Sequence, residues 1–219
     1  DQMTEIPGLF AAGECDYSQH GANRLGANSL LSAIYGGSVA GPNAVKYIKG
    51  LQKHAEDLPE EIYTRREKEE QEKWEAILKM DGTENAYLLH KELGEWMTDN
   101  MTVVRVNSKL EETYAKLTEL QERWENININ DTQKWSNQGA HFTRQLKNML
   151  YLAKVMTKGA LMRDESRGAH YKPDFPERDD ERFLKTTMAK FDPATGEPII
   201  TYAEVDVSLI PPRKRDYSA

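Results

Sequence analysis

Residues 20–31 combine side chains that are able to bind a polar, anionic ligand. The stretch reads His-Gly-Ala-Asn-Arg-Leu-Gly-Ala-Asn-Ser-Leu-Leu, so an imidazole, a guanidinium and two asparagines precede an apolar run. The planar guanidinium of Arg24 offers paired donors that match a carboxylate, and it keeps its charge near neutral pH. Gly21 and Gly26 allow the sharp bends and the close ligand approach that such a loop requires. This composition is typical of a binding site rather than of a hydrophobic core.

A second segment, residues 6–14, lies just upstream and ends in an acid. Its sequence, Ile-Pro-Gly-Leu-Phe-Ala-Ala-Gly-Glu, predicts a turn, a short buried strand and a close backbone approach that ends at Glu14. Downstream of residues 20–27, Asn28 is a candidate N-cap for a helix. A helix start has unpaired N–H groups and a partial positive charge, and both favour a negatively charged ligand.

These two segments resemble the end of the FAD-binding domain in the flavoprotein subunit of succinate dehydrogenase and fumarate reductase. The resemblance implies that Glu14 binds the ribityl hydroxyls of FAD and that Arg24 binds a carboxylate of a C4 dicarboxylate substrate. It also implies that the amides of Ser29 and Leu30 face the pyrimidine edge of the flavin. Asn28 could cap the helix and contact the flavin at the same time. His20 either contacts the substrate or holds the loop by hydrogen bonds, and the second role is favoured.

The sequence lacks a Gly-x-Gly-x-x-Gly motif after an early strand, so it predicts no dinucleotide phosphate turn. In the family that it resembles, the histidine that carries FAD, the proton-donating arginine and the other substrate-binding residues lie upstream of such a segment. We therefore expect the C-terminal portion of a larger subunit, with no catalytic residue of its own. The isolated chain is expected neither to hold FAD tightly nor to oxidise succinate.

Composition narrows the possible functions. The length of 219 residues suits one or two domains, and the formal net charge of −7 argues against nucleic-acid binding. The single cysteine excludes an internal disulfide and a cysteine-based iron–sulfur or zinc site, and we predict no metal site. No apolar run reaches the roughly 18 residues of a membrane span, because Gly36, Gly37 and Pro42 interrupt the nearest candidate. Direct membrane insertion is therefore not expected.

Local signals divide the chain into segments. The helix from Asn28 is expected to reach Gly50, with Pro42 kinking or restarting it. Residues 51–58 are predicted to be a polar linker, which separates residues 1–50 from a helical domain over residues 59–165. Pro59, followed by two glutamates, is typical of a helix start.

Apolar residues at helical spacing predict an antiparallel bundle of three or four helices over residues 59–165. A helix over residues 83–99 would place Leu88 in the core. Residues 108–111 match a capping box, and Asp131 is expected to cap a longer helix that buries Trp135 and Met156. The predicted fold class is mainly α, with this bundle preceded by a remnant (a short strand plus a helix) of an α/β FAD-binding domain.

The tail, residues 166–219, is predicted to carry short β-strands over residues 185–191 and 198–205. The run Glu-Ser-Arg-Gly-Ala-His at 165–170 and the ending Pro-Pro-Arg-Lys-Arg-Asp-Tyr at 211–217 resemble segments of the same flavoprotein family. We interpret Glu165, Arg167 and His170 as structural residues that tie the last helix of the bundle to the tail or to the missing part of the FAD domain.

The resemblance implies a subunit that uses FAD to oxidise succinate to fumarate, or the reverse, and passes electrons to an iron–sulfur subunit and a quinone. Its partners would be that iron–sulfur subunit and a membrane anchor, and it would be cytoplasmic, peripheral on the cytoplasmic face of the inner membrane. Two alternatives stay open. One is L-aspartate oxidase, a soluble relative with similar motifs. The other is an interaction module, a helical bundle whose acidic faces dock a partner subunit.

Overall fold

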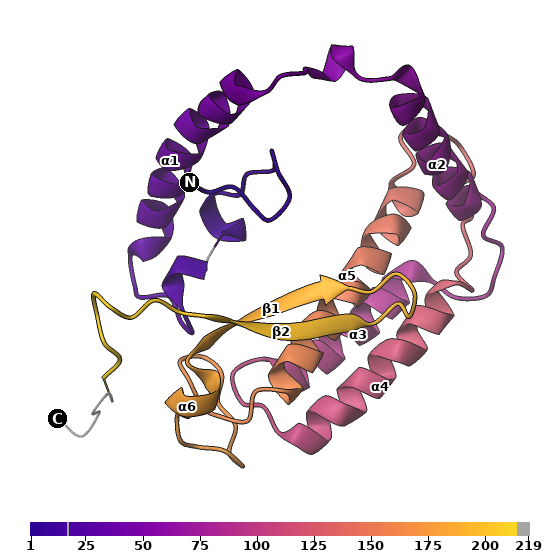
Figure 1. The fold of residues 1–219 in the computed structure, drawn as a ribbon. Helices are drawn as coiled ribbons and strands as arrows, with labels where there is room; N and C mark the ends of the chain where they lie inside the picture. Colours follow the sequence, from indigo (N-terminus) through magenta and orange to yellow (C-terminus); the bar gives the residue numbers. More distant parts are fainter. Residues whose placement is uncertain (17, 214–219) are drawn as a thin grey trace. The chain divides into compact units, whose positions relative to one another are not determined.

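The computed structural model describes residues 1–16 and 18–213 (Figure 1). The chain divides into two compact units, Asp1–Ala76 and a second unit that begins at Ile77. The sheet in the described part is a two-stranded hairpin, and the other long elements are helices. The predicted mainly α fold class is therefore confirmed.

Helix α1, Asn28–Gly50, is the main element of the first unit, and it begins and ends where the sequence predicts. The helix is continuous through Pro42, so it does not restart there, and the alternative of a kink at Pro42 stays a prediction. The prediction that Asn28 caps the helix is wrong. The N-cap is Ala27, which has a φ of 64° and makes no side-chain cap hydrogen bond. Asn28 is the first helical residue, and its N–H donates to the Leu25 carbonyl in the preceding turn.

The predicted buried strand before Glu14 does not form. Residues 1–12 instead make one isolated antiparallel bridge, between Met3 and Phe10, and Leu9 is 51% exposed. A short apolar run becomes a buried strand only where neighbouring strands pair with it and cover it. The described residues of this unit supply that single bridge, after which the chain enters the 3₁₀ turn η1, Gly13–Cys15.

Helix α2, Glu60–Leu78, begins directly after Pro59, as predicted. Ion pairs such as Arg66–Glu70, at 2.8 Å, run along its exposed surface, so the charged run is a solvated helix face. Ile77 and Leu78, at its end, are buried. The predicted linker, residues 51–58, contains the 3₁₀ turn η3, Ala55–Asp57. The division between the two compact units falls between Ala76 and Ile77, within α2. The domain boundary predicted at residues 51–58 stays a prediction.

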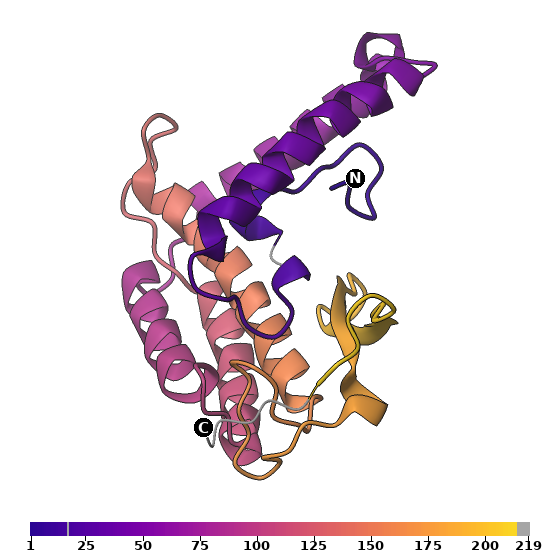
Figure 2. The same cartoon turned by 90° about the vertical axis from the view of Figure 1, so that its left-hand side faces the viewer.

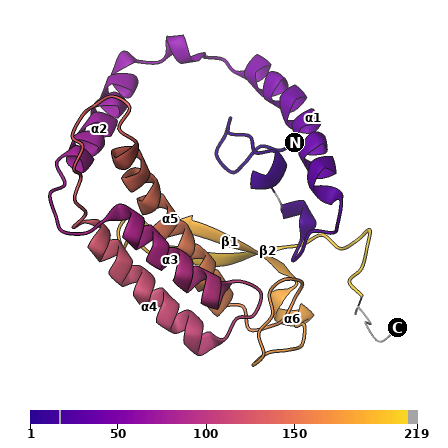
Figure 3. The same ribbon diagram turned by 180° about the vertical axis from the view of Figure 1, so that it is seen from behind.

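The second unit contains a bundle of three helices, α3 (Ala86–Met101), α4 (Asn107–Trp124) and α5 (Gln138–Leu161). The end of α4 meets the start of α5, where the indole N–H of Trp124 donates to the Thr143 carbonyl at 2.8 Å. The end of α3 meets the start of α4 and the end of α5 in the cluster of Met101, Leu110 and Ala160. Helix α4 is therefore antiparallel to both neighbours (Figures 1 and 3).

Two helix starts differ from the predicted caps. Helix α4 begins at Asn107 with Val106 as N-cap, so Ser108 lies inside the helix and the capping box does not form. Helix α5 is capped by Asn137, whose side chain accepts the Ala140 N–H at 2.8 Å. Asp131, the predicted cap, instead accepts the N–H of residue 133 in the preceding loop. Short polar side chains such as Ser and Asp accept hydrogen bonds from backbone N–H groups in turns as readily as at helix starts. Their presence in the sequence therefore does not by itself locate the first residue of a helix.

The bundle core follows the predicted apolar stripes with three exceptions. Leu89 and Leu117, for example, lie on these stripes and are completely buried. Leu88, Trp135 and Met156 are 66%, 88% and 53% exposed, so their predicted burial is wrong. Trp135 precedes α5 and lies in a loop, whereas Leu88 and Met156 lie on the outer faces of their helices.

The tail forms a short helix, α6 (Asp180–Phe183), and the strands β1 (Lys185–Phe191) and β2 (Pro198–Glu204). Both predicted strands form, the second ending one residue earlier than expected, and they pair antiparallel with Lys185 opposite Glu204. Both strands contact α5, and Figure 2 shows the hairpin beside that helix. Residues 214–217 of the C-terminal motif lie outside the described residues. No helix in the described part is long and apolar enough to cross a bilayer.

Candidate functional site

The predicted ligand-binding residues all lie in the first unit. They occupy η1, the 3₁₀ turn η2 (Ser18–His20), the loop of residues 21–27 and the first turn of α1. Glu14 and Arg24 are exposed, and His20 is half-buried. Asn28, Ser29 and Leu30 are the first three residues of α1. The fold therefore brings the candidate residues into one compact unit.

A pair of glycines lets η1 lie close to α1. A Cβ at Gly36 of α1 would lie 3.3 Å from the Gly13 nitrogen, closer than side chains normally pack. Gly13 has a φ of 81°, a left-handed conformation that residues with a Cβ rarely adopt. These two positions place the segment that carries Glu14 directly against the helix that carries Ser29 and Leu30.

The start of α1 has the properties of an acceptor-binding site. No side chain caps it, and the N–H groups of Ser29 and Leu30 are among those that have no partner within a helix. The helix dipole adds a partial positive charge at this end. Leu30 and Leu31 are 75% and 65% exposed, so apolar surface adjoins these donors. The donor groups beside apolar surface fit a flat heteroaromatic ring with carbonyl acceptors on one edge.

His20 is held by the first turns of α1. Its Nε2 lies 3.1 Å from the Oγ of Ser32, and that hydroxyl donates to the Ser29 carbonyl at 2.9 Å. A serine hydroxyl has one proton to donate, so Ser32 must accept from the ring Nε2–H. This contact supports the loop-holding role of His20, whereas its contact with substrate stays a prediction.

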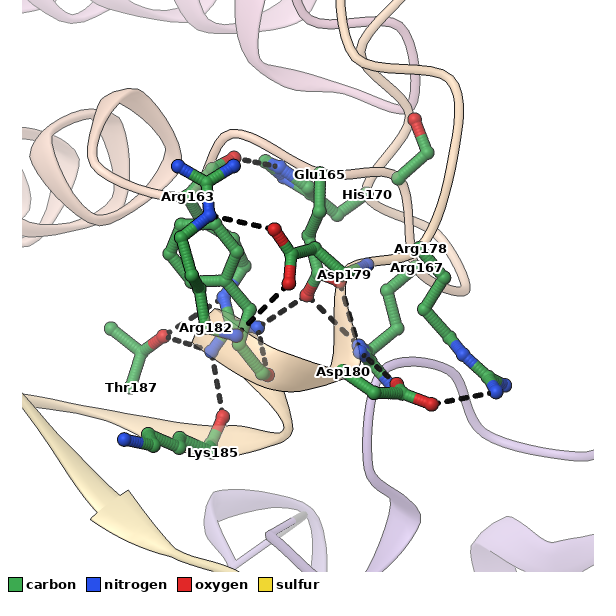
Figure 4. Close-up of polar contacts among 12 residues, drawn as sticks. Arg163, Glu165, Arg167, His170, Arg178, Asp179, Asp180, Arg182, Lys185 and Thr187 are labelled. Carbon is green, nitrogen blue, oxygen red and sulfur yellow. Dashed lines mark hydrogen bonds and ion pairs between the residues drawn. The ribbon is translucent and has the colours of Figure 1, made fainter. Parts of the chain in front are cut away.

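The motif at residues 165–170 forms a buried ion-pair network in the second unit (Figure 4). Glu165 is completely buried and accepts hydrogen bonds from Arg163 at 2.6 Å, Arg167 at 2.9 Å and the Asp179 N–H at 2.9 Å. Burial acts to raise the pKa of the Glu165 carboxyl, but these hydrogen bonds outweigh it and hold the pKa below its ordinary value. Glu165 is therefore a charged, paired group rather than a proton donor.

The arginines extend this network to the tail. Arg163 donates to the Phe183 carbonyl at 2.8 Å and to the Lys185 carbonyl at 2.6 Å. Arg167 pairs with Asp180 of α6 at 2.7 Å. Figure 4 shows these contacts converging between the end of α5 and the start of β1. They confirm the predicted structural tie between the last helix of the bundle and the tail.

His170 connects the network to the loop between α3 and α4. Its Nδ1 lies 2.6 Å from Nη1 of Arg105, and its Nε2 lies 2.9 Å from the Arg163 carbonyl. Arg105 can only donate, so Nδ1 accepts and Nε2–H donates, which requires a neutral ring. Burial lowers the pKa of His170 to about 4, and the positive charge of Arg105 acts in the same direction.

Sequence reasoning missed two buried lysines. Lys154 is 2% exposed, and its Nζ lies 2.5 Å from Oε1 of Glu197. The Tyr114 hydroxyl donates to the other carboxylate oxygen of Glu197, Oε2. Lys172 is completely buried and donates to the Leu161 carbonyl at 3.1 Å and to Asp164 at 2.9 Å. It therefore supplies a hydrogen-bond donor to the carbonyl of the last residue of α5. The available signal was the place of Lys154 four residues after Leu150, on the face of α5 that is buried.

Metal binding finds no support in the described residues, where no three His, Cys, Asp or Glu side chains are grouped to hold an ion. The one cysteine, Cys15, is exposed and free. The groups in the first unit that could recognise a ligand are the Arg24 guanidinium, the Glu14 carboxylate and the amides at the start of α1.

The sequence matches two family models. The model for the fumarate reductase flavoprotein C-terminal region matches residues 90–217, and the model for an FAD binding domain matches residues 1–30. The succinate dehydrogenase flavoprotein subunit of Bacillus subtilis (strain 168) is 68% identical over 218 residues, which are 100% of this chain and 37% of that protein. The fumarate reductase flavoprotein subunit of Escherichia coli (strain K12) is 36% identical over 217 residues, 98% of this chain and 35% of that protein.

The structure agrees with these sequence matches. A solved variant of the E. coli quinol fumarate reductase chain superposes with a TM-score of 0.86 and 34% identity, over 95% of this chain and 35% of that chain. This chain thus spans little more than a third of the length of the relatives that it matches. It belongs to the family of succinate dehydrogenase and fumarate reductase flavoprotein subunits, and it corresponds to their C-terminal part.

Proposed function

We propose that this chain is the C-terminal portion of an FAD-dependent flavoprotein subunit that interconverts succinate and fumarate. The observation that carries the proposal is that Glu14, Arg24 and the uncapped start of α1 belong to one compact unit whose residues 1–30 match an FAD-binding domain. The 68% identity to a succinate dehydrogenase flavoprotein subunit supports the same reaction.

Each residue has a distinct role in this proposal. Arg24 binds one carboxylate of the dicarboxylate through paired hydrogen bonds. Glu14 binds ribityl hydroxyls, and Asn28, Ser29 and Leu30 place the helix start at the flavin. FAD would supply the hydride chemistry. The residues of this chain would bind and orient, and the acid and covalent-attachment groups are assigned to the rest of the subunit.

Replacing Arg24 in the full-length flavoprotein tests the carboxylate site. Arg24→Lys keeps the charge but removes the paired donors, so we expect dicarboxylate binding to weaken by about 2 kcal/mol, roughly 30-fold. Calorimetric titration with a dicarboxylate measures the change. Arg65→Lys is the matched control, because Arg65 lies on the exposed face of α2. Equal affinities for the two variants would refute the assignment of Arg24.

The 219-residue chain by itself is proposed to be inactive, because it spans 37% of the most identical relative named above. We expect no succinate-dependent dye reduction by the purified chain with added FAD. Dye reduction above that of a heat-denatured sample would contradict this proposal.

The full-length subunit is proposed to act on succinate rather than on L-aspartate. The matched relatives are named succinate dehydrogenase or fumarate reductase subunits, which favours this choice over L-aspartate oxidase. Assays of the full-length protein with succinate and with L-aspartate separate the two. Turnover of L-aspartate alone would reverse the choice.

The proposed partners are an iron–sulfur subunit and a membrane anchor, with electrons passing to a quinone. The solved relative is named a quinol fumarate reductase, which supports a quinone as the final partner. The proposed location is the cytoplasmic face of the inner membrane, as a peripheral subunit. Co-purification of the full-length flavoprotein with a tagged iron–sulfur subunit tests this assembly, and failure to co-purify would count against it.

A further inference from the structure

The loop that carries Arg24, residues 21–27, is connected to α1 at both ends. Its backbone bends through left-handed conformations at Gly21, with φ 62°, and at Ala27, with φ 64°. Among the described atoms, none lies within 4 Å of the Cβ positions at Gly21 and Gly26, so side-chain packing on these positions does not hold the loop. The contact between His20 and Ser32 ties the beginning of the loop to the helix.

The hydrogen bonds of Ser32 link this loop to the first turn of α1. The ring Nε2–H of His20 donates to the Ser32 Oγ, and the Ser32 hydroxyl donates to the Ser29 carbonyl. Ser29 is also the residue whose N–H is proposed to face the flavin. One side chain therefore connects the segment that presents the guanidinium to the turn that presents the helix-start amides.

We propose that Ser32 is a positioning residue for the carboxylate site. By accepting from His20, it fixes the entry of the loop and keeps Arg24 in register with the first turn of α1. The inference rests on the proposed function, because it assigns Ser32 a role in the binding site of Arg24. Ser32 itself touches neither substrate nor flavin in this proposal.

Helix α1 provides a matched comparison. Serines in helices commonly donate to a carbonyl in the preceding turn, and this bond by itself indicates no special role. Ser38 makes that bond to the Tyr35 carbonyl at 2.8 Å, just as Ser32 bonds to Ser29 at 2.9 Å. Ser32 differs from Ser38 by accepting from a histidine twelve positions away. Ser38→Ala therefore controls for loss of the common serine bond.

The test uses the full-length flavoprotein with bound FAD. We expect Ser32→Ala to raise the dicarboxylate Kd and KM about tenfold, as expected from the loss of one positioning hydrogen bond. It should leave the FAD content and, within about twofold, kcat unchanged. Ser32→Thr, which keeps a hydroxyl, should restore the affinity, and Ser38→Ala should match the unaltered protein.

A second readout does not depend on turnover. Long-range ¹H–¹⁵N spectra should show the His20 ring as its Nε2–H tautomer, and this ring proton should exchange with solvent faster in Ser32→Ala than in Ser38→Ala. Amides of residues 21–27 should also exchange faster in Ser32→Ala than in Ser38→Ala.

The outcomes separate this inference from the proposed function. If Arg24→Lys weakens dicarboxylate binding but Ser32→Ala behaves like Ser38→Ala, the role of Ser32 is wrong and the site stands. If Ser32→Ala loses FAD together with substrate affinity, Ser32 is a general structural residue and the inference is overturned. If Arg24→Lys has no effect, the carboxylate site itself fails.

Discussion

Arg105 and His170 are separated by 65 positions in the sequence, yet Nη1 of the arginine lies 2.6 Å from Nδ1 of the histidine. Arg105 also donates to the Thr102 carbonyl at 3.0 Å, just after α3, and His170 lies 2.9 Å from the Arg163 carbonyl, just after α5. The imidazole therefore connects the ends of two bundle helices. It can do so only while neutral, because a second ring proton would point at the Arg105 guanidinium.

This geometry predicts a pH-dependent stability. The pKa of His170 is about 4 in the folded chain, against 6.5 ordinarily, so between these values the unfolded state binds more protons. The free energy of unfolding should not depend on this group above pH 6.5. It should fall as the pH decreases from 6.5 to 4, by at most about 3 kcal/mol. Urea denaturation at pH 7.5 and pH 4.5 measures the loss.

His170→Gln removes this titration and should flatten the pH dependence between pH 4.5 and 6.5. His141→Gln is its control, because His141 is exposed on α5, and it should keep the pH dependence of the unaltered chain. Identical profiles for the two variants would show that folding does not lower the pKa of His170.

Glu165→Gln should strongly destabilise the second unit. The substitution leaves the half-buried guanidinium groups of Arg163 and Arg167 without the buried carboxylate that both contact. Breaking a buried ion pair in this way costs about 3 kcal/mol or more. Thermal unfolding measures the loss, with Glu181→Gln on the exposed face of α6 as control. A melting temperature equal to that of the control would contradict the structural role.

Gly82→Ala should disrupt the junction between α2 and α3. A Cβ at Gly82 would overlap the backbone carbonyl of Asn126, which cannot move away without breaking the bridge between Asp81 and Asn128. Gly94→Ala, in α3, would meet no atom within 4 Å among the described residues, and it should stabilise the helix by up to about 1 kcal/mol. In urea denaturation, the free energy of unfolding should fall for Gly82→Ala and rise for Gly94→Ala. A higher free energy of unfolding for Gly82→Ala would refute the close contact between Gly82 and Asn126.

Tyr114→Phe should loosen the hairpin from the bundle. The variant loses the hydrogen bond from α4 to Glu197 in the hairpin turn but leaves the ion pair of Glu197 with Lys154. We expect a loss of about 1 kcal/mol and faster amide exchange across β1 and β2. Tyr87→Phe, whose ring stacks on Phe142 in an exposed position, should leave the hairpin unchanged. Equal exchange rates in both variants would remove Tyr114 from this role.

The bounds of α1, the start of α2 and the hairpin were predictable because their signals are local. Proline at a helix start, a glycine at a helix end and a turn-rich segment between two β-rich runs act within a few residues. The motif at residues 20–31 was recognisable for the same reason. Its residues are contiguous in the sequence, so their types and spacing can be recognised without knowledge of the tertiary structure.

The sequence alone thus determined where most helices lie, which residues form the candidate site and which family the chain resembles. Only the tertiary structure decided that Lys154 and Lys172 are buried, that Ser32 holds His20 and that Trp135 lies outside the core. A buried charge is stable only beside a partner, and each of these lysines meets a carboxylate that the fold brings to it. No local pattern encodes such pairing, because its energy depends on how helices, loops and hairpin pack.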